Sequence, residues 1–107
     1  MDILETFETF RGNTFYKEIS INDYIFKKDD IIKIAVIDIL TSQELFSEEK
    51  EFDEETESYE LYIYPEDTKQ FPIRDLLLEI EITIDTNFVQ TFQYILEVKE
   101  DWIVWVR

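Results

Sequence analysis

Apolar and polar residues alternate with a period of two along most of this chain. The clearest case is residues 76–84, where every even position is leucine or isoleucine and the polar residues Glu79, Glu81 and Thr83 stand between them. Successive side chains of a β-strand point to opposite faces, so such a segment has one buried and one solvated face. The alternation therefore predicts an all-β fold built from half-buried strands.

About seven strands follow from this pattern. The expected strands are residues 4–10, 15–21, 31–40, 45–52, 58–64, 76–84 and 88–98. Helix competes only over residues 42–52, and as a single turn over residues 67–71. Short strands with turn signals every 8–12 residues are typical of an antiparallel β-sandwich. With 107 residues and 45% hydrophobic content, we expect one domain over residues 1–107.

The composition limits the chemistry that the chain can perform. It has 26 acidic and 10 basic residues, a net charge of −16, and neither histidine nor cysteine. A single glycine, Gly12, excludes glycine-rich phosphate loops. We therefore expect no enzyme, no catalytic residue, no cofactor and no metal site. Phosphate and anionic lipid headgroups would be repelled, so nucleic acid and membranes are not expected partners. Nor does the N-terminal sequence resemble a secretory signal.

Carboxylates cluster in two places. Residues 48–60 hold eight acids and one lysine, which predicts a solvated loop, with a basic partner or a hard cation as alternatives. A calcium site needs six to eight converging oxygens, and the spacing of an EF-hand is absent. Glu79 and Glu81 are two residues apart on one strand face, about 6.5 Å from each other. Exposed positions opposite an apolar face explain this pair without invoking glycosidase chemistry.

Two aromatic groups are candidate protein interfaces. Residues 102–106 form a last short strand or an apolar docking tail, in which Trp102, Ile103 and Trp105 are the candidate contact residues. Tyr62 and Tyr64 share the face of their strand opposite its aliphatic residues. We interpret this face as core and rim packing, with a protein interface or a carbohydrate platform as alternatives.

Short turn motifs complete the pattern. Gly12, Asn13 and Thr14 form the first, and Pro65, Asp67 and Thr68 the second; in the latter, Asp67 and Thr68 are expected to cap a helical turn. Four segments carry such motifs in order: 11–15, 26–34, 62–68, and 78–82 with 89–92.

Together these segments resemble the immunoglobulin-like β-sandwich domains of tailed-phage and prophage virion proteins, as at the N-terminus of some baseplate upper proteins. That family has a Gly-Asp-Thr triplet before its second strand, a Gly-Asp pair opening its third, and a Pro-Glu-Asp-Thr-like turn before its penultimate strand. Here Asn13 stands in place of the Asp of the triplet, Asp29 replaces the Gly before Asp30, and the last strand lacks a common glycine.

The resemblance implies a non-enzymatic structural or assembly protein of a phage tail or baseplate. It would be made in the host cytoplasm, reside in the virion, and contact other virion proteins or copies of itself in a homo-oligomer. A second hypothesis follows from the charge alone: an acidic nucleic-acid mimic that occupies a basic groove of a host defence nuclease. Steep loss of binding with salt would distinguish the mimic.

Overall fold

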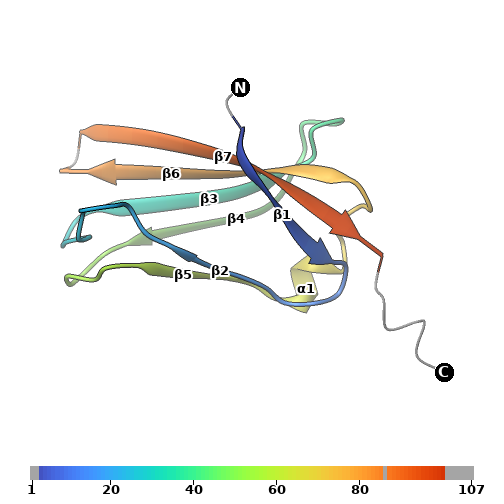
Figure 1. The fold of residues 1–107 in the computed structure, drawn as a ribbon, viewed down its shortest axis with the longest axis horizontal. Helices are drawn as coiled ribbons and strands as arrows, with labels where there is room; N and C mark the ends of the chain where they lie inside the picture. Colours follow the sequence, from blue (N-terminus) through green and yellow to red (C-terminus); the bar gives the residue numbers. More distant parts are fainter. Residues whose placement is uncertain (1–2, 86, 101–107) are drawn as a thin grey trace.

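The computed structural model of the protein describes residues 3–85 and 87–100 (Figure 1). The elements are β1 (Ile3–Phe10), β2 (Phe15–Ile19), β3 (Ile31–Ile37), β4 (Glu44–Glu51), β5 (Tyr59–Ile63), α1 (Pro65–Thr68), β6 (Asp75–Ile84) and β7 (Phe88–Lys99). Five strands form one sheet in the order β1-β7-β6-β3-β4, and β2 pairs with β5 in a second sheet. The all-β prediction is confirmed.

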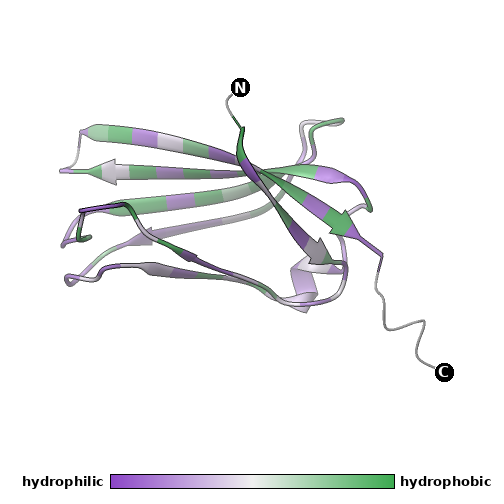
Figure 2. Cartoon of the chain, in the orientation of Figure 1, coloured by the Kyte–Doolittle hydropathy of each residue, from purple (hydrophilic) through white to green (hydrophobic). Residues whose placement is uncertain are grey.

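One apolar core joins the two sheets. The even-numbered residues of β6 from Leu76 to Ile82 are at most 2% exposed, as the alternation predicts. Leu61 and Ile63 of β5 reach the same core from the smaller sheet and are fully buried. Figure 2 shows the alternation as stripes along the strands. Each sheet thus buries one face and leaves the other available for contacts.

The direction of β1 corrects the prediction of a purely antiparallel fold. β1 pairs with β7 in parallel, while the other strand pairs are antiparallel. On β1, Phe7 faces inward, where its ring stacks on Tyr94 of β7 at 4.9 Å and lies 6.2 Å from the ring of Phe15 on β2. The prediction failed because a period of two is the same in parallel and antiparallel strands, so it cannot encode direction.

Two predicted turn motifs meet in space. Gly12 has a φ of 90°, and the amide of Asn13 donates to the carbonyl of Phe10 at 3.0 Å, which closes the turn between β1 and β2. The buried hydroxyl of Thr68 donates to the carbonyl of Asn13 at 2.8 Å. Pro65 begins α1, which has Tyr64 as N-cap and no side-chain cap. The predicted capping role of Asp67 and Thr68 was therefore wrong: Thr68 ties α1 to the first turn.

Two other elements differ from the predictions, one in its end and one in its type. β3 ends at Ile37 because Asp38 starts a turn: its carboxylate accepts the amide of Leu40 at 3.1 Å, and Ser42 takes a φ of 62°. Residues 44–51 form a strand, so the competing helix over 42–52 is wrong; β4 instead pairs with β3 over its length. Tertiary pairing outweighed local helix propensity here.

Asp38 is 3% exposed, and its carboxylate forms an ion pair with Arg74, through Nη2 and through Nε at 3.2 Å. Arg74 precedes β6, so the pair fastens the end of β3 to the start of its neighbour. The hydrogen bond from Arg74 lowers the pKa of Asp38, although burial opposes this shift. Asp38 is thus held in its charged form by a structural partner.

We expect Thr68→Val to lower the free energy of unfolding by about 1–2 kcal/mol, because it leaves the carbonyl of Asn13 without its donor. Thr68→Ser is the matched control, since it keeps the hydroxyl. Urea denaturation measures both variants. Equal stability of Thr68→Val and the parent chain would contradict a stabilising tie between α1 and the first turn.

The Asp38 pair also predicts a pH dependence. A carboxyl whose pKa is lowered by folding contributes stability that is fully present above its unfolded pKa of about 3.9, and that is lost as pH falls through the folded value. The parent chain should therefore exceed Asp38→Asn in stability at pH 7, and the difference should shrink towards pH 3. Urea unfolding across this range tests it, with the exposed Asp53→Asn as control. A pH-independent difference would refute the assignment.

Candidate protein-interaction surface

The outer face of the β2–β5 sheet exposes three tyrosines. In the register of this sheet Tyr16 lies opposite Tyr62, and Glu18 lies opposite Glu60. The alternate residues, such as Phe15 and Leu61, point into the core, which forces these four side chains outward. Tyr16, Tyr62 and Tyr64 are 46%, 39% and 53% exposed. We call these three residues the tyrosine face.

The rings of the tyrosine face are ordered by one another. The centroids of Tyr16 and Tyr62 are 4.9 Å apart with the rings tilted by 45°. Tyr62 and Tyr64 are 5.8 Å apart and nearly parallel, at 4°. Tyr64 is also the extended N-cap residue of α1, with Pro65 fixing the backbone after it. The result is a continuous aromatic surface whose rings are already placed before any partner arrives.

Carboxylates border this surface. Glu60 accepts a hydrogen bond from the hydroxyl of Tyr16 at 3.1 Å, and Glu18 accepts one from Ser58 at 3.4 Å. Burial, followed by the hydrogen bond to Glu60, raises the pKa of Tyr16, so this hydroxyl stays a donor at neutral pH. Within the described residues neither Glu18 nor Glu60 forms an ion pair. Two like charges therefore face each other across the strands, an arrangement that destabilises a sheet.

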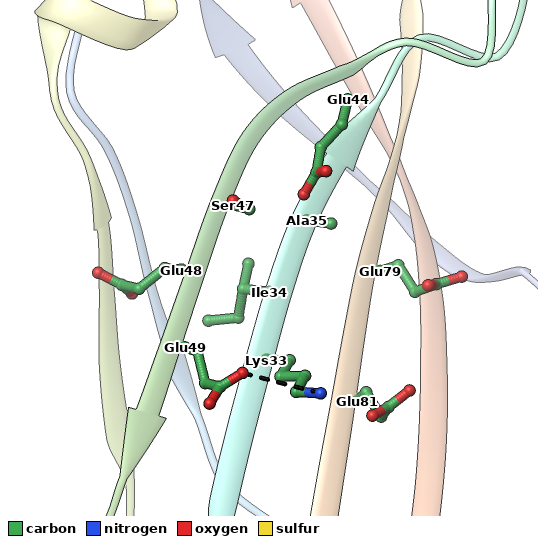
Figure 3. Close-up of a pocket in the computed structure, with 9 residues that line it drawn as sticks. All are labelled: Lys33, Ile34, Ala35, Glu44, Ser47, Glu48, Glu49, Glu79 and Glu81. Carbon is green, nitrogen blue, oxygen red and sulfur yellow. Dashed lines mark ion pairs between the residues drawn. The ribbon is translucent and has the colours of Figure 1, made fainter.

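A second acidic surface lies on the outer face of the larger sheet (Figure 3). Ala35 of β3 is flanked by Glu79 of β6 and Ser47 of β4, and its small side chain leaves a shallow hollow there. Lys33, two residues before Ala35 on the same face, lies between Glu81 and Glu49 and forms an ion pair with Glu49 at 3.7 Å. This hollow is acidic, but a lysine within it offsets part of the charge.

The predicted site residues fall into three groups. Tyr62 and Tyr64 lie together on one face, as parity predicted, but this face is exposed, so the interpretation as core and rim packing is wrong. The turn residues Gly12, Asn13, Thr14, Pro65, Asp67 and Thr68 lie at the connected ends of β1, β2 and α1. Trp102, Ile103 and Trp105 lie outside the described residues.

Sequence analysis missed Tyr16 as a member of the tyrosine face. Its parity on the strand was readable, but its partner was not, because only the β2–β5 register places it against Tyr62. The acidic segment 48–60 is also divided by the structure between the end of β4, a connection, and the start of β5. Within it Phe52 is buried and stacks on Phe26 at 4.7 Å, so the segment is anchored rather than wholly solvated.

Comparisons of the chain with models of protein families, with curated proteins and with solved structures gave no match. In the part of the chain that the structure describes, no helix is long and apolar enough to cross a membrane. Across residues 3–85 and 87–100, no three or more acidic side chains are grouped so as to hold a metal ion. The two exposed sheet faces are thus the candidate interaction surfaces of the protein.

We expect Glu18→Lys to raise the free energy of unfolding by about 0.5 kcal/mol at low salt, because it converts the repulsive pair with Glu60 into an attractive one. The gain should shrink as salt screens the charges. Glu55→Lys, in the exposed connection before β5, makes the same change in net charge and is the control. Urea unfolding at two salt concentrations measures both. Equal gains would mean that only net charge matters.

Proposed function

We propose that this chain is an immunoglobulin-like domain that acts without catalysis, through protein–protein contacts, in the tail or baseplate of a phage or prophage particle. The observation that carries the proposal is the order of its strands. β7-β6-β3-β4 corresponds to the G-F-C-C′ order of a variable-type immunoglobulin sheet, and β2-β5 corresponds to the B–E pair of the facing sheet. β1 lies beside the G-like strand at the edge.

The backbone at two motif positions supports the same assignment. Gly12, the glycine that begins the family-like triplet, has a φ of 90°. Asp29, which stands where the family has glycine, has a φ of 76°, in the region that glycine occupies most easily. The amide of Asp30 donates to the carbonyl of Lys27 at 3.1 Å to close this turn. Asp29 therefore preserves the turn geometry, since aspartate tolerates left-handed backbone better than most residues.

The buried carboxylates support a structural rather than a catalytic role. Asp30 is 1% exposed and accepts hydrogen bonds from the hydroxyl of Tyr24 at 2.5 Å and the amide of Lys27 at 3.0 Å. Burial and then this hydrogen bond raise the pKa of Tyr24 to about 12. Asp38 is held by Arg74 in the same manner. Both groups are used to fasten turns and strand ends to one another.

The second candidate, an acidic nucleic-acid mimic, is favoured by one feature. Carboxylates of Glu44, Glu49, Glu79 and Glu81 surround the hollow on the larger sheet (Figure 3). A basic groove on a nuclease would contact this outer face, and its affinity would fall steeply with salt. Inhibition of purified nucleases by the protein, lost when Glu79 and Glu81 are both changed to Gln, would favour this candidate over the particle.

Particle membership is tested by purifying phage particles from the induced source strain on a density gradient and identifying their proteins by mass spectrometry. We expect the chain to co-sediment with tail proteins at a fixed copy number. Its recovery only in the soluble fraction, with particles intact, would contradict the proposal.

The candidate interface at residues 102–106 predicts a change in native mass. Light scattering should find a multimer for the full chain and a folded monomer for a version that ends at Glu100. A full chain that is already monomeric would rule out self-assembly through these residues and leave a different virion protein as the partner.

A further inference from the structure

We propose that the tyrosine face, together with Glu18 and Glu60, binds an arginine-bearing segment of a partner protein. The guanidinium group would stack on the exposed rings and form ion pairs with the two carboxylates. This inference rests on the proposed function in one respect only, that the partner is a protein.

The rings supply the first half of the site. Tyr16, Tyr62 and Tyr64 expose large areas in one continuous surface, with adjacent centroids 4.9 and 5.8 Å apart. Tyrosine offers contact area at low entropic cost, and here its rings are already fixed by mutual packing. A guanidinium is planar and weakly hydrated, and it stacks on aromatic faces within about 6 Å of the centroid. In the described residues, the contacts of lysine with aromatic rings involve Phe7 and Tyr24 and leave the tyrosine face free.

The carboxylates supply the second half. Glu18 and Glu60 lie opposite each other two register pairs from Tyr16 and Tyr62, and therefore on the same face of the sheet. Their hydrogen bonds to Ser58 and Tyr16 use one oxygen each, which leaves the second oxygen of each carboxylate to accept from a guanidinium. A cation placed between them removes the repulsion of the like-charged pair. A guanidinium has five donors, enough to reach both carboxylates while its plane lies on a ring.

The charge of this surface favours an arginine-bearing partner over a second copy of the chain or a neutral sugar. A second copy of the chain, itself at −16, would bring further carboxylates against Glu18 and Glu60. A neutral saccharide would stack on the rings but would not offset the negative charges of Glu18 and Glu60. The hollow on the larger sheet is a weaker cation site, because Lys33 already bridges to Glu49 and no aromatic residue lines it. Among the described residues, the outer face of the β2–β5 sheet combines exposed aromatic rings with carboxylates that form no ion pair.

The test is a titration of the full-length, ¹⁵N-labelled protein followed by amide chemical shifts. The probes are the peptide Gly-Arg-Gly-Arg-Gly, its lysine counterpart, and maltoheptaose as a neutral sugar. We expect the arginine peptide to shift the amides of β2 and β5, to bind at least about threefold more tightly than the lysine peptide, and to weaken with salt. Shifts centred on β3, β4 and β6, or a sugar that binds this face more tightly than the peptide, would overturn the proposal.

Two matched double variants separate a local site from net charge. Glu18→Gln with Glu60→Gln should raise the Kd of the arginine peptide at least about fivefold, as expected for a loss of roughly 1 kcal/mol. Glu79→Gln with Glu81→Gln removes the same charge from the opposite sheet and should change Kd less than twofold. Equal effects of the two variants would show that binding follows net charge alone and would overturn the proposal.

A second pair of variants tests the rings. Tyr16→Ala with Tyr62→Ala should abolish the preference for arginine over lysine, whereas Tyr16→Phe with Tyr62→Phe should keep it, because phenylalanine retains the aromatic face. Circular dichroism confirms that each variant is folded. A preference that survives the alanine variant would refute stacking. If the protein binds the arginine peptide as expected but is absent from purified particles, the proposed role in a particle is wrong and the proposed binding surface is supported.

Discussion

The burial of one apolar layer between two sheets is the constraint on which the rest of this structure depends. Leu78 and Ile80 of β6 are buried in the same core as Leu61 and Ile63 of β5, and burial of apolar surface is the largest favourable term in folding. Once these alternate positions face inward, the residues between them must face outward. The tyrosine face and the acidic hollow are therefore the outer sides of the same strands that build the core.

Buried and exposed carboxylates have different surroundings in this structure. The two buried carboxylates each have local partners: Asp30 accepts hydrogen bonds from the hydroxyl of Tyr24 and a backbone amide, and Asp38 forms an ion pair with Arg74. The exposed carboxylates are left mostly to solvent, and with a net charge of −16 they repel one another. Such repulsion costs stability, and it is relieved where a cationic partner binds. This makes the distribution of unpaired carboxylates, rather than their number, the guide to a binding surface.

Small irregular features join the ends of the strands. Gly12 turns the chain from β1 to β2, and the hydroxyl of Thr68 fastens α1 to that turn. Asp29 and Asp30 lead into β3 through another tight turn. These turns coincide with the motifs from which the family resemblance was drawn. The motifs can therefore be explained by backbone geometry, and together with the strand order they support the proposed immunoglobulin-like fold.

The sequence by itself determined the all-β class, the approximate strands, the inward face of β6 and the placement of Tyr62 on the face opposite Leu61, because alternation with a period of two is local and survives any arrangement of strands. Only the tertiary structure decided the parallel pairing of β1 with β7, the contact of Thr68 with the first turn, and the meeting of Tyr16 with Tyr62. Those features depend on strand direction and register between segments far apart in the chain. The alternation within a single strand specifies neither the direction nor the register of its pairing, because any register that keeps the apolar residues inside would bury the same core.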